Sequence, residues 1–181
     1  ITKFTGERFT PRPADLAEDV RGLESEEPEG LPDVMPLRAP RAPDAGLPTA
    51  FLITEEDCRP EDFDTGSYDI RTVATLSASH LRSPRAVSGD VAGFEAGALA
   101  DTARRMRAEA TALRAGVPGD LATWAARAGA RQIVTPYVPT GPLRDWLNEA
   151  ETALDAQGIT LCEMRRDWDA AIWPHATAGF F

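Results

Sequence analysis

Apolar residues in this chain gather in short runs separated by polar or glycine-containing turns. Four of these runs are rich in β-branched residues and have the length of buried strands. The run at 50–54 is apolar at nearly every position, which is typical of a strand covered on both faces, as in a parallel sheet. Strands are therefore predicted at residues 50–54, 69–77, 132–135 and 159–164.

Between these runs, apolar residues recur every three to four positions, which is the period of an amphipathic helix. Helices are predicted at residues 94–113, 121–128 and 142–157. Asp120 and Thr140 are the expected N-caps, and Gly129 and Gly158 the expected stops. Because a strand, a crossover helix and a second strand build a parallel sheet, the predicted fold class is α/β. We expect a three-layer α/β/α, Rossmann-like domain with a mostly parallel sheet of about four to five strands.

The N-terminal quarter of the chain has a different composition. Eight prolines between residues 10 and 48 exclude long helices and internal strands, and an acidic patch at 24–29 adds to the polar character. We therefore expect residues 10–48 to be an extended linker. Residues 1–9 are too short to fold alone, and residues 49–181 form the predicted compact domain.

The net charge and the cysteine content exclude some classes of function for this chain. The chain has 181 residues and a formal net charge of −10, which repels phosphate backbones and argues against direct nucleic-acid binding. Cys58 and Cys162 lack metal-site spacing and are expected to be free thiols in a reducing, cytoplasmic setting. No apolar run approaches the roughly 20 residues of a membrane span, and no signal peptide is visible. Because the chain begins at Ile1 without a methionine, we expect it to be a segment of a longer protein.

The loop between the third predicted strand and the last helix is the candidate binding site. Ligands of open α/β sheets lie at the carboxyl ends of strands, and free N–H groups at a helix start attract anions. Arg144 in the first turn adds a candidate bidentate anion contact. An ordinary strand–helix connection stays open as the alternative, because three prolines remove donors from the loop. The candidate cofactor-binding residues are Thr135, Tyr137, Thr140, Gly141 and Arg144.

Other chemistry-bearing residues favour plainer interpretations. Glu55, Glu56 and Asp57 have the composition to hold a metal ion or a ribose, but a solvated acidic turn is the preferred interpretation. His80 and His175 have no partner in a catalytic or metal motif, so surface or packing roles are preferred. Neither a G-x-G-x-x-G fingerprint nor a P-loop lysine motif is present, and no catalytic or metal-binding residue is assigned.

Several strings in the chain, in the same order, resemble a bacterial group within the photolyase/cryptochrome family. The first nine residues look like the end of that group's FAD-binding helical domain. Further similar strings follow at Leu52–Asp57, Arg82–Pro84, Gly97–Asp101, Val134–Pro142 and Trp168–Phe181.

The resemblance implies that the parent protein is a flavoprotein that repairs pyrimidine dimers in DNA with light, or senses blue light. FAD and the DNA contacts would belong to the parent's helical domain, outside this chain. The segment itself would be a non-catalytic α/β domain that covers the flavin domain and can hold an antenna chromophore. The family's usual third strand is not expected here, because residues 112–118 are few and rich in proline and glycine. Two alternatives stay open: a structural docking module without ligand, and an unrelated small nucleotide-binding α/β domain.

Overall fold

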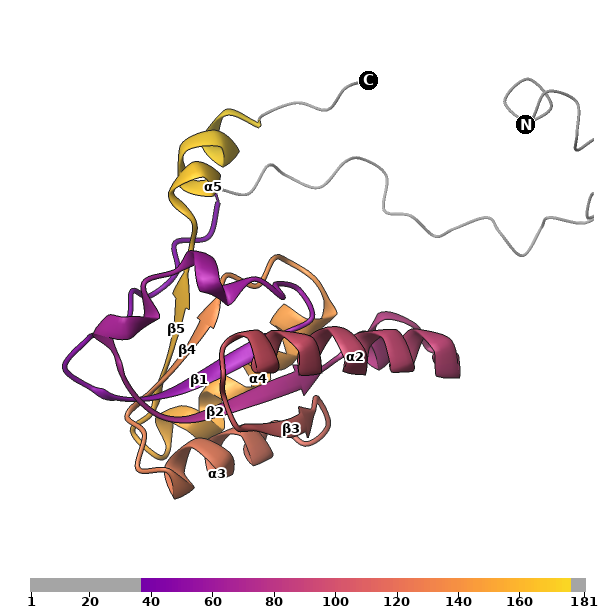
Figure 1. Ribbon diagram of the computed structural model, residues 1–181, viewed down its shortest axis with the longest axis horizontal. Coiled ribbons are helices and arrows are strands. Elements are labelled where there is room, and N and C mark those ends of the chain that lie inside the picture. Colours follow the sequence, from indigo (N-terminus) through magenta and orange to yellow (C-terminus); the bar gives the residue numbers. More distant parts are fainter. Residues whose placement is uncertain (1–36, 177–181) are drawn as a thin grey trace, which may run out of the picture. The chain divides into compact units, whose positions relative to one another are not determined.

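The computed structural model describes residues 37–176, which form one five-stranded sheet (Figure 1). All neighbouring strands are parallel and follow the order β3-β2-β1-β4-β5. This is the order of the first five strands of a Rossmann sheet, so the predicted fold class is confirmed. The strands are β1 (Pro48–Thr54), β2 (Asp69–Ser77), β3 (Ala110–Arg114), β4 (Gln132–Pro136) and β5 (Thr160–Met164).

Helices cover both faces of the sheet, which produces the three layers. Ala50 and Leu52 of β1 pack towards α3 and α4, whereas Phe51 and Ile53 pack towards α2. All four side chains are fully buried, because the strand lies between two layers of helices. The helices are α2 (Gly89–Arg105), α3 (Gly119–Arg127), α4 (Pro142–Asp155) and the short α5 (Asp167–Ile172).

The prediction of one long helix at 94–113 is wrong at both ends. The observed helix α2 covers Gly89–Arg105, and the last part of the predicted helix forms a strand. α2 ends at Arg105 in a Schellman motif: the Ala108 N–H donates to the Ala103 carbonyl at 3.0 Å, and Arg107 adopts φ 55°. Residues 110–114 then pair with β2 as the edge strand β3. Their alanine-rich composition suits a helix, but the hydrogen bonds offered by the edge of β2 outweigh that weak preference.

The predicted N-caps Asp120 and Thr140 were displaced by two residues and by one residue, whereas the predicted glycine stops were correct. α3 begins at Gly119 with Pro118 at the cap, and α4 begins at Pro142 with Gly141 at the cap. Gly129 and Gly158 follow α3 and α4 with φ 69° and φ 65°. Glycine is favoured there because a left-handed residue ends a helix most readily when it has no Cβ.

Residues 37–47, which we call the strap, lie against the free edge of β5 and the first residue of β4. The Glu163 N–H donates to the Arg41 carbonyl at 3.0 Å, and the Asp44 N–H donates to Gln132 Oε1 at 3.0 Å. The compact unit therefore begins at Leu37, before the expected start near residue 49. The expected tail at 1–9, the rest of the expected linker and the chain end at 177–181 lie outside the described residues.

Four 3₁₀ turns complete the elements found between residues 37 and 176. η2 and η3 lie between β1 and β2, η4 follows β2, and η5 follows α5. None of the helices in residues 37–176 combines the length and apolar character needed to cross a membrane. The turns are η2 (Pro60–Asp62), η3 (Thr65–Ser67), η4 (Ser79–Arg82) and η5 (Trp173–His175).

Candidate functional site at the carboxyl edge of the sheet

The strand order reverses between β1 and β4. The chain leaves β1 towards β2 on one side and later returns to β4 on the other side. In open α/β sheets, ligands bind at such a switch point, outside the carboxyl ends of the strands. Here the loops beginning at Glu55 and Tyr137 lie at that edge, together with the segment that follows β5.

Four of the five predicted binding residues lie in or beside the loop after β4, in different surroundings. Thr135 is fully buried in β4, and its hydroxyl has no hydrogen-bond partner within residues 37–176. Tyr137 is half-buried, and its N–H donates to the Met164 carbonyl at 2.8 Å. Thr140 is exposed, and Gly141 takes the cap position with φ 154°, a conformation that residues with a side chain rarely adopt.

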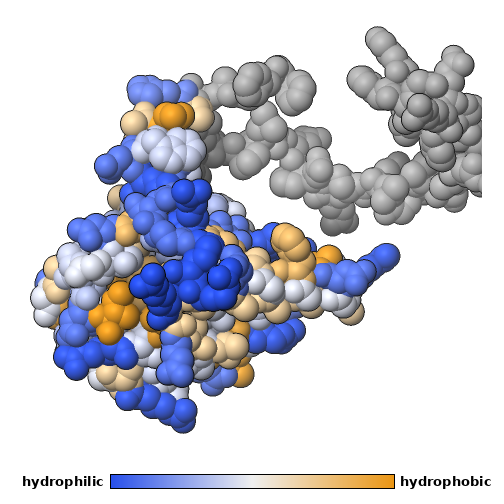
Figure 2. All heavy atoms as spheres, viewed as in Figure 1, coloured by the Kyte–Doolittle hydropathy of each residue, from blue (hydrophilic) through white to orange (hydrophobic). Residues whose placement is uncertain are grey.

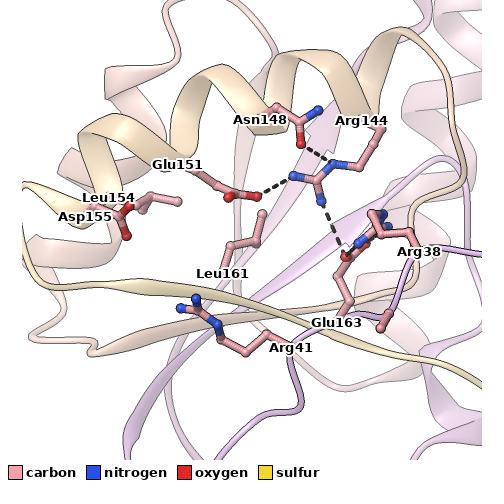
Figure 3. A pocket seen from close by; sticks show the side chains of 10 residues that line it. Arg38, Arg41, Arg144, Asn148, Glu151, Leu154, Asp155, Leu161 and Glu163 are labelled. Atoms are coloured by element: carbon pink, nitrogen blue, oxygen red, sulfur yellow. Dashed lines mark hydrogen bonds and ion pairs between the residues drawn. The ribbon is translucent and has the colours of Figure 1, made fainter.

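The fifth predicted residue, Arg144, is directed away from the start of α4 (Figure 3). Its guanidinium donates to Asn148 Oδ1 at 2.8 Å and to Glu151 Oε1 at 2.5 Å, and lies 3.4 Å from Glu163 Oε2. The residue is only 5 % exposed. Because carboxylates already neutralise it, Arg144 is engaged in packing α4 on β5 and does not complete an anion cleft with Thr140 and Gly141.

Glu163 is the centre of this polar cluster. Its carboxylate accepts hydrogen bonds from both terminal nitrogens of Arg38 and, at 2.9 Å, from the Val138 N–H. Arg38 also donates to the Val138 carbonyl at 3.0 Å. The hydrogen bond to Glu163 raises the pKa of Arg38 above its ordinary value. Glu163 therefore ties the strap to the loop after β4, beside a cavity of about 300 Å³.

Aromatic and guanidinium groups stack at the end of β5. The rings of Tyr137 and Trp173 lie 5.3 Å apart at 59°. The Arg38 guanidinium lies 4.6 Å from the Tyr137 ring centre, and that of Arg165 lies 4.5 Å from it and 5.4 Å from the Trp173 ring. A guanidinium within about 6 Å of an aromatic ring centre is attracted to the electron-rich face of the ring. Tyr137, Arg165 and Trp173 of this stack line a pocket at the carboxyl edge of the sheet.

The switch-point pocket has a volume of about 230 Å³ and is enclosed by three separate segments. Glu56 follows β1, Tyr137 follows β4, and Trp168 and Trp173 follow β5. Trp168 is 60 % exposed, so one large aromatic surface remains uncovered within residues 37–176. The pocket combines aromatic faces with acidic and basic groups, which suits a planar, polar ring more than an aliphatic ligand.

Asp57 and Arg166 close one side of this pocket. Arg166 donates to both carboxylate oxygens of Asp57, to Asp62 at 3.2 Å and to the Arg59 carbonyl at 2.9 Å. The hydrogen bond to Asp57 raises the pKa of Arg166 well above its ordinary value. Asp57 is therefore already paired with Arg166. It is not free to bind a metal ion or a ribose, which was one interpretation of the acidic residues 55–57.

Glu55 differs sharply from its two neighbours. Its side chain is 9 % exposed, and neither carboxylate oxygen has a hydrogen-bond partner within residues 37–176. Arg82 Nη2 lies 3.6 Å from Glu55 Oε1, and it donates a hydrogen bond to Glu56 Oε1 at 2.7 Å. Burial raises the pKa of Glu55 to about 7. Sequence reasoning missed this group, because an acidic triplet after a strand carries no signal that one member turns inwards.

The other side chains able to coordinate a metal ion do not lie close together in residues 37–176. Within residues 37–176 no group of three or more histidine, cysteine or acidic side chains is arranged to hold a metal ion. Cys58 is a half-buried free thiol and Cys162 a buried one, and burial raises the pKa of both. Raised thiol pKa values disfavour the reactive thiolate form.

These features define a Rossmann-like α/β domain with an aromatic and charged pocket at its switch point. No family model matches the chain, and no curated protein matches it. The chemistry of the pocket therefore carries the functional interpretation.

Proposed function

We propose that this chain is a non-catalytic α/β domain of a photolyase-like flavoprotein, which holds an aromatic pigment at its switch point. FAD and the DNA contacts would belong to the parent's helical domain, and the net charge of −10 agrees with a segment that does not itself bind DNA. A Rossmann-like fold is compatible with this role but is shared by many functions. More specific support comes from how the family-like strings are arranged in space.

Three of these strings, distant in sequence, meet around one pocket. Glu56 and Asp57 belong to the string at 52–57, Tyr137 and Pro139 to that at 134–142, and Trp168 to the last string. If these strings resembled the family only in residues that pack the core, they would not be expected to meet around one cavity. This convergence is the observation on which the proposal depends most.

The pocket's size limits how a pigment would bind. Its 230 Å³ lies below the roughly 300–1,000 Å³ of most small-molecule sites. One ring system would fill it and stack on the exposed face of Trp168, and the rest of the molecule would extend over the surface. A parent helical domain covering this edge would bury that remainder.

The test uses the longer parent protein purified with its native ligands. We expect an absorption spectrum that contains FAD and a second, non-covalent pigment. Trp168→Ala should release the second pigment and leave the FAD content unchanged. Ile172→Ala is the matched control, because Ile172 is 54 % exposed on the same helix but does not line the pocket, and it should retain both chromophores.

Two outcomes would redirect the proposal. A parent without flavin would contradict the photolyase-like assignment. A parent with FAD alone, after reconstitution with flavin, deazaflavin and pterin, would favour the structural docking module. That second candidate is supported by the internal pairing of Asp57 with Arg166 and of Arg144 with Glu151, which leaves few groups free for a ligand.

A further inference from the structure

A second hollow lies at the carboxyl ends of β2 and β3, apart from the switch-point pocket. It has a volume of about 600 Å³ and lies between η4, the loop at 83–87 and the first half of α2. Its volume is within the range of small-molecule sites. None of its lining residues lines the switch-point pocket, so the two are separate.

The hollow is locally basic in an acidic chain. Arg85 and Arg114 both line it, both are exposed, and neither forms an ion pair within residues 37–176. His80 lines it as well, and its Nε2 lies 2.8 Å from the Ala115 carbonyl, so Nε2 donates that hydrogen bond. Two uncommitted guanidinium groups on neighbouring segments are a recognised means of binding an oxyanion.

The one carboxylate in the lining is already occupied. Glu95 accepts from the Ala78 and Ser79 N–H groups at 2.8 and 3.0 Å and from the Ser79 hydroxyl at 2.5 Å. Burial opposes its ionisation, but the hydrogen bonds from Ser79 and Ala78 outweigh that effect and lower its pKa. Glu95 therefore stabilises the turn after β2, and its hydrogen bonds leave the two arginines available.

The rest of the lining is divided between polar and apolar surface. Ser83 lies beside Arg85, whose N–H donates to the Ser83 hydroxyl at 3.1 Å, and this turn places the arginine at the rim. Pro84, Val87 and Ala92 supply an apolar wall. The start of α2 adds a weak positive dipole on the same side. An anionic group with an apolar body attached would contact both kinds of surface.

We propose that this hollow binds a phosphate monoester carried on a small aromatic or apolar molecule. The phosphate lies between Arg85 and Arg114, and the organic part lies on the wall formed by Pro84, Val87 and Ala92. The site does not depend on the pigment proposed above, because the two pockets share no residue.

Titration of the 181-residue chain with phenyl phosphate, followed by calorimetry and amide chemical shifts, tests the proposal. We expect saturable binding, shifts concentrated in residues 77–96 and 114, and weaker binding at higher salt. Inorganic phosphate should bind more weakly than phenyl phosphate, and phenol should not bind. Loss of one charged hydrogen-bonding group should weaken binding about tenfold, so Arg85→Ala and Arg114→Ala should each do so.

Arg127→Ala is the matched control, because it removes the same charge from an exposed position at the end of α3 and should leave binding unchanged. Circular dichroism of each variant establishes that the fold is retained, and Arg114→Lys replaces Arg114→Ala if that variant unfolds. The proposal is overturned if phenyl phosphate does not saturate. It is equally overturned if the shifts lie elsewhere, or if the control weakens binding as much as the two site variants.

Discussion

Glu55 lies in surroundings that disfavour a charged carboxylate. Its carboxyl group is buried without hydrogen-bond partners in the described part of the chain, and Glu95 and Glu56 add like charge nearby. Arg82 at 3.6 Å offsets only part of the cost of burying this charge, so burial favours the neutral acid. The ordinary pKa of 4.5 therefore rises to about 7 on folding.

This shift makes stability depend on pH in a definite direction. An acid with a raised pKa in the folded state destabilises that state as pH rises from about 4.5 through about 7. Glu55→Gln mimics the neutral form and should raise the free energy of unfolding by about 1–2 kcal/mol above pH 7. The gain should shrink towards zero as pH falls to about 4.5. Urea denaturation of both proteins across this range measures the difference.

Glu149→Gln is the control, because Glu149 is exposed on α4 and has no ion pair within residues 37–176. It should change stability little at any pH. A Glu55→Gln variant that is less stable than the parent chain above pH 7 would show that ionised Glu55 has a stabilising partner in solution.

At the scale of elements, the end of α2 decides whether the sheet has four strands or five. Arg107 occupies the left-handed position of the Schellman motif, where most helices place glycine. Its exposed side chain makes no hydrogen bond within residues 37–176. The backbone conformation is therefore imposed by the pairing of β3 with β2 and not by Arg107 itself.

Replacing Arg107 with glycine should relieve this backbone strain. Left-handed backbone costs a residue with a Cβ about 1 kcal/mol, so Arg107→Gly should stabilise the domain by up to about that amount. Arg104→Gly, three residues earlier and inside α2, should instead destabilise it by about 1 kcal/mol. Guanidinium denaturation monitored by tryptophan fluorescence compares the two. Equal effects of the two substitutions would contradict the left-handed helix end at Arg107.

At the scale of the whole molecule, the strap is part of the domain. Arg38 supplies the closest cationic contact to buried Glu163, which is only 4 % exposed, and it also holds the loop after β4. Removing one partner of a buried ion pair leaves a charge without its counterion, and that is strongly destabilising.

Two shortened chains should therefore differ in stability. One that begins at Leu37 keeps the strap and should unfold in a single cooperative transition. One that begins at Pro48 lacks Arg38 and should be less stable by about 3 kcal/mol, because Glu163 keeps only the more distant Arg144. Adding Glu163→Gln to the shorter chain should restore part of the loss. Identical thermal midpoints for the two chains would show that the strap contributes nothing.

The strands that sequence reasoning placed best are those in which local pattern and tertiary surroundings agree. β2 was predicted with its observed bounds, because β-branched residues recur along it between clear breaks. β3 was missed, because a short strand of alanine, threonine, leucine and arginine has no such pattern and depends on its neighbour for hydrogen bonds.

The candidate site shows the same division. Sequence reasoning correctly placed the loop after β4 at the carboxyl edge, and Tyr137 lines the pocket there. It assigned Arg144 to an anion, but the structure engages that side chain with Glu151 and Glu163. It preferred a solvated turn for the acidic triplet, whereas Glu55 is buried and Asp57 is paired with Arg166.

The parallel α/β architecture can be predicted from the sequence, because strand length, helical period and glycine stops are properties of neighbouring residues. The edge strand β3, the strap and the pairing of charges at the site became visible only in the folded chain. These depend on partners far apart in the chain, such as Arg38 with Glu163 and Asp57 with Arg166, separated by 125 and 109 residues. A charge is neutralised or left uncompensated by whatever lies within a few ångströms of it, and folding alone brings such residues together.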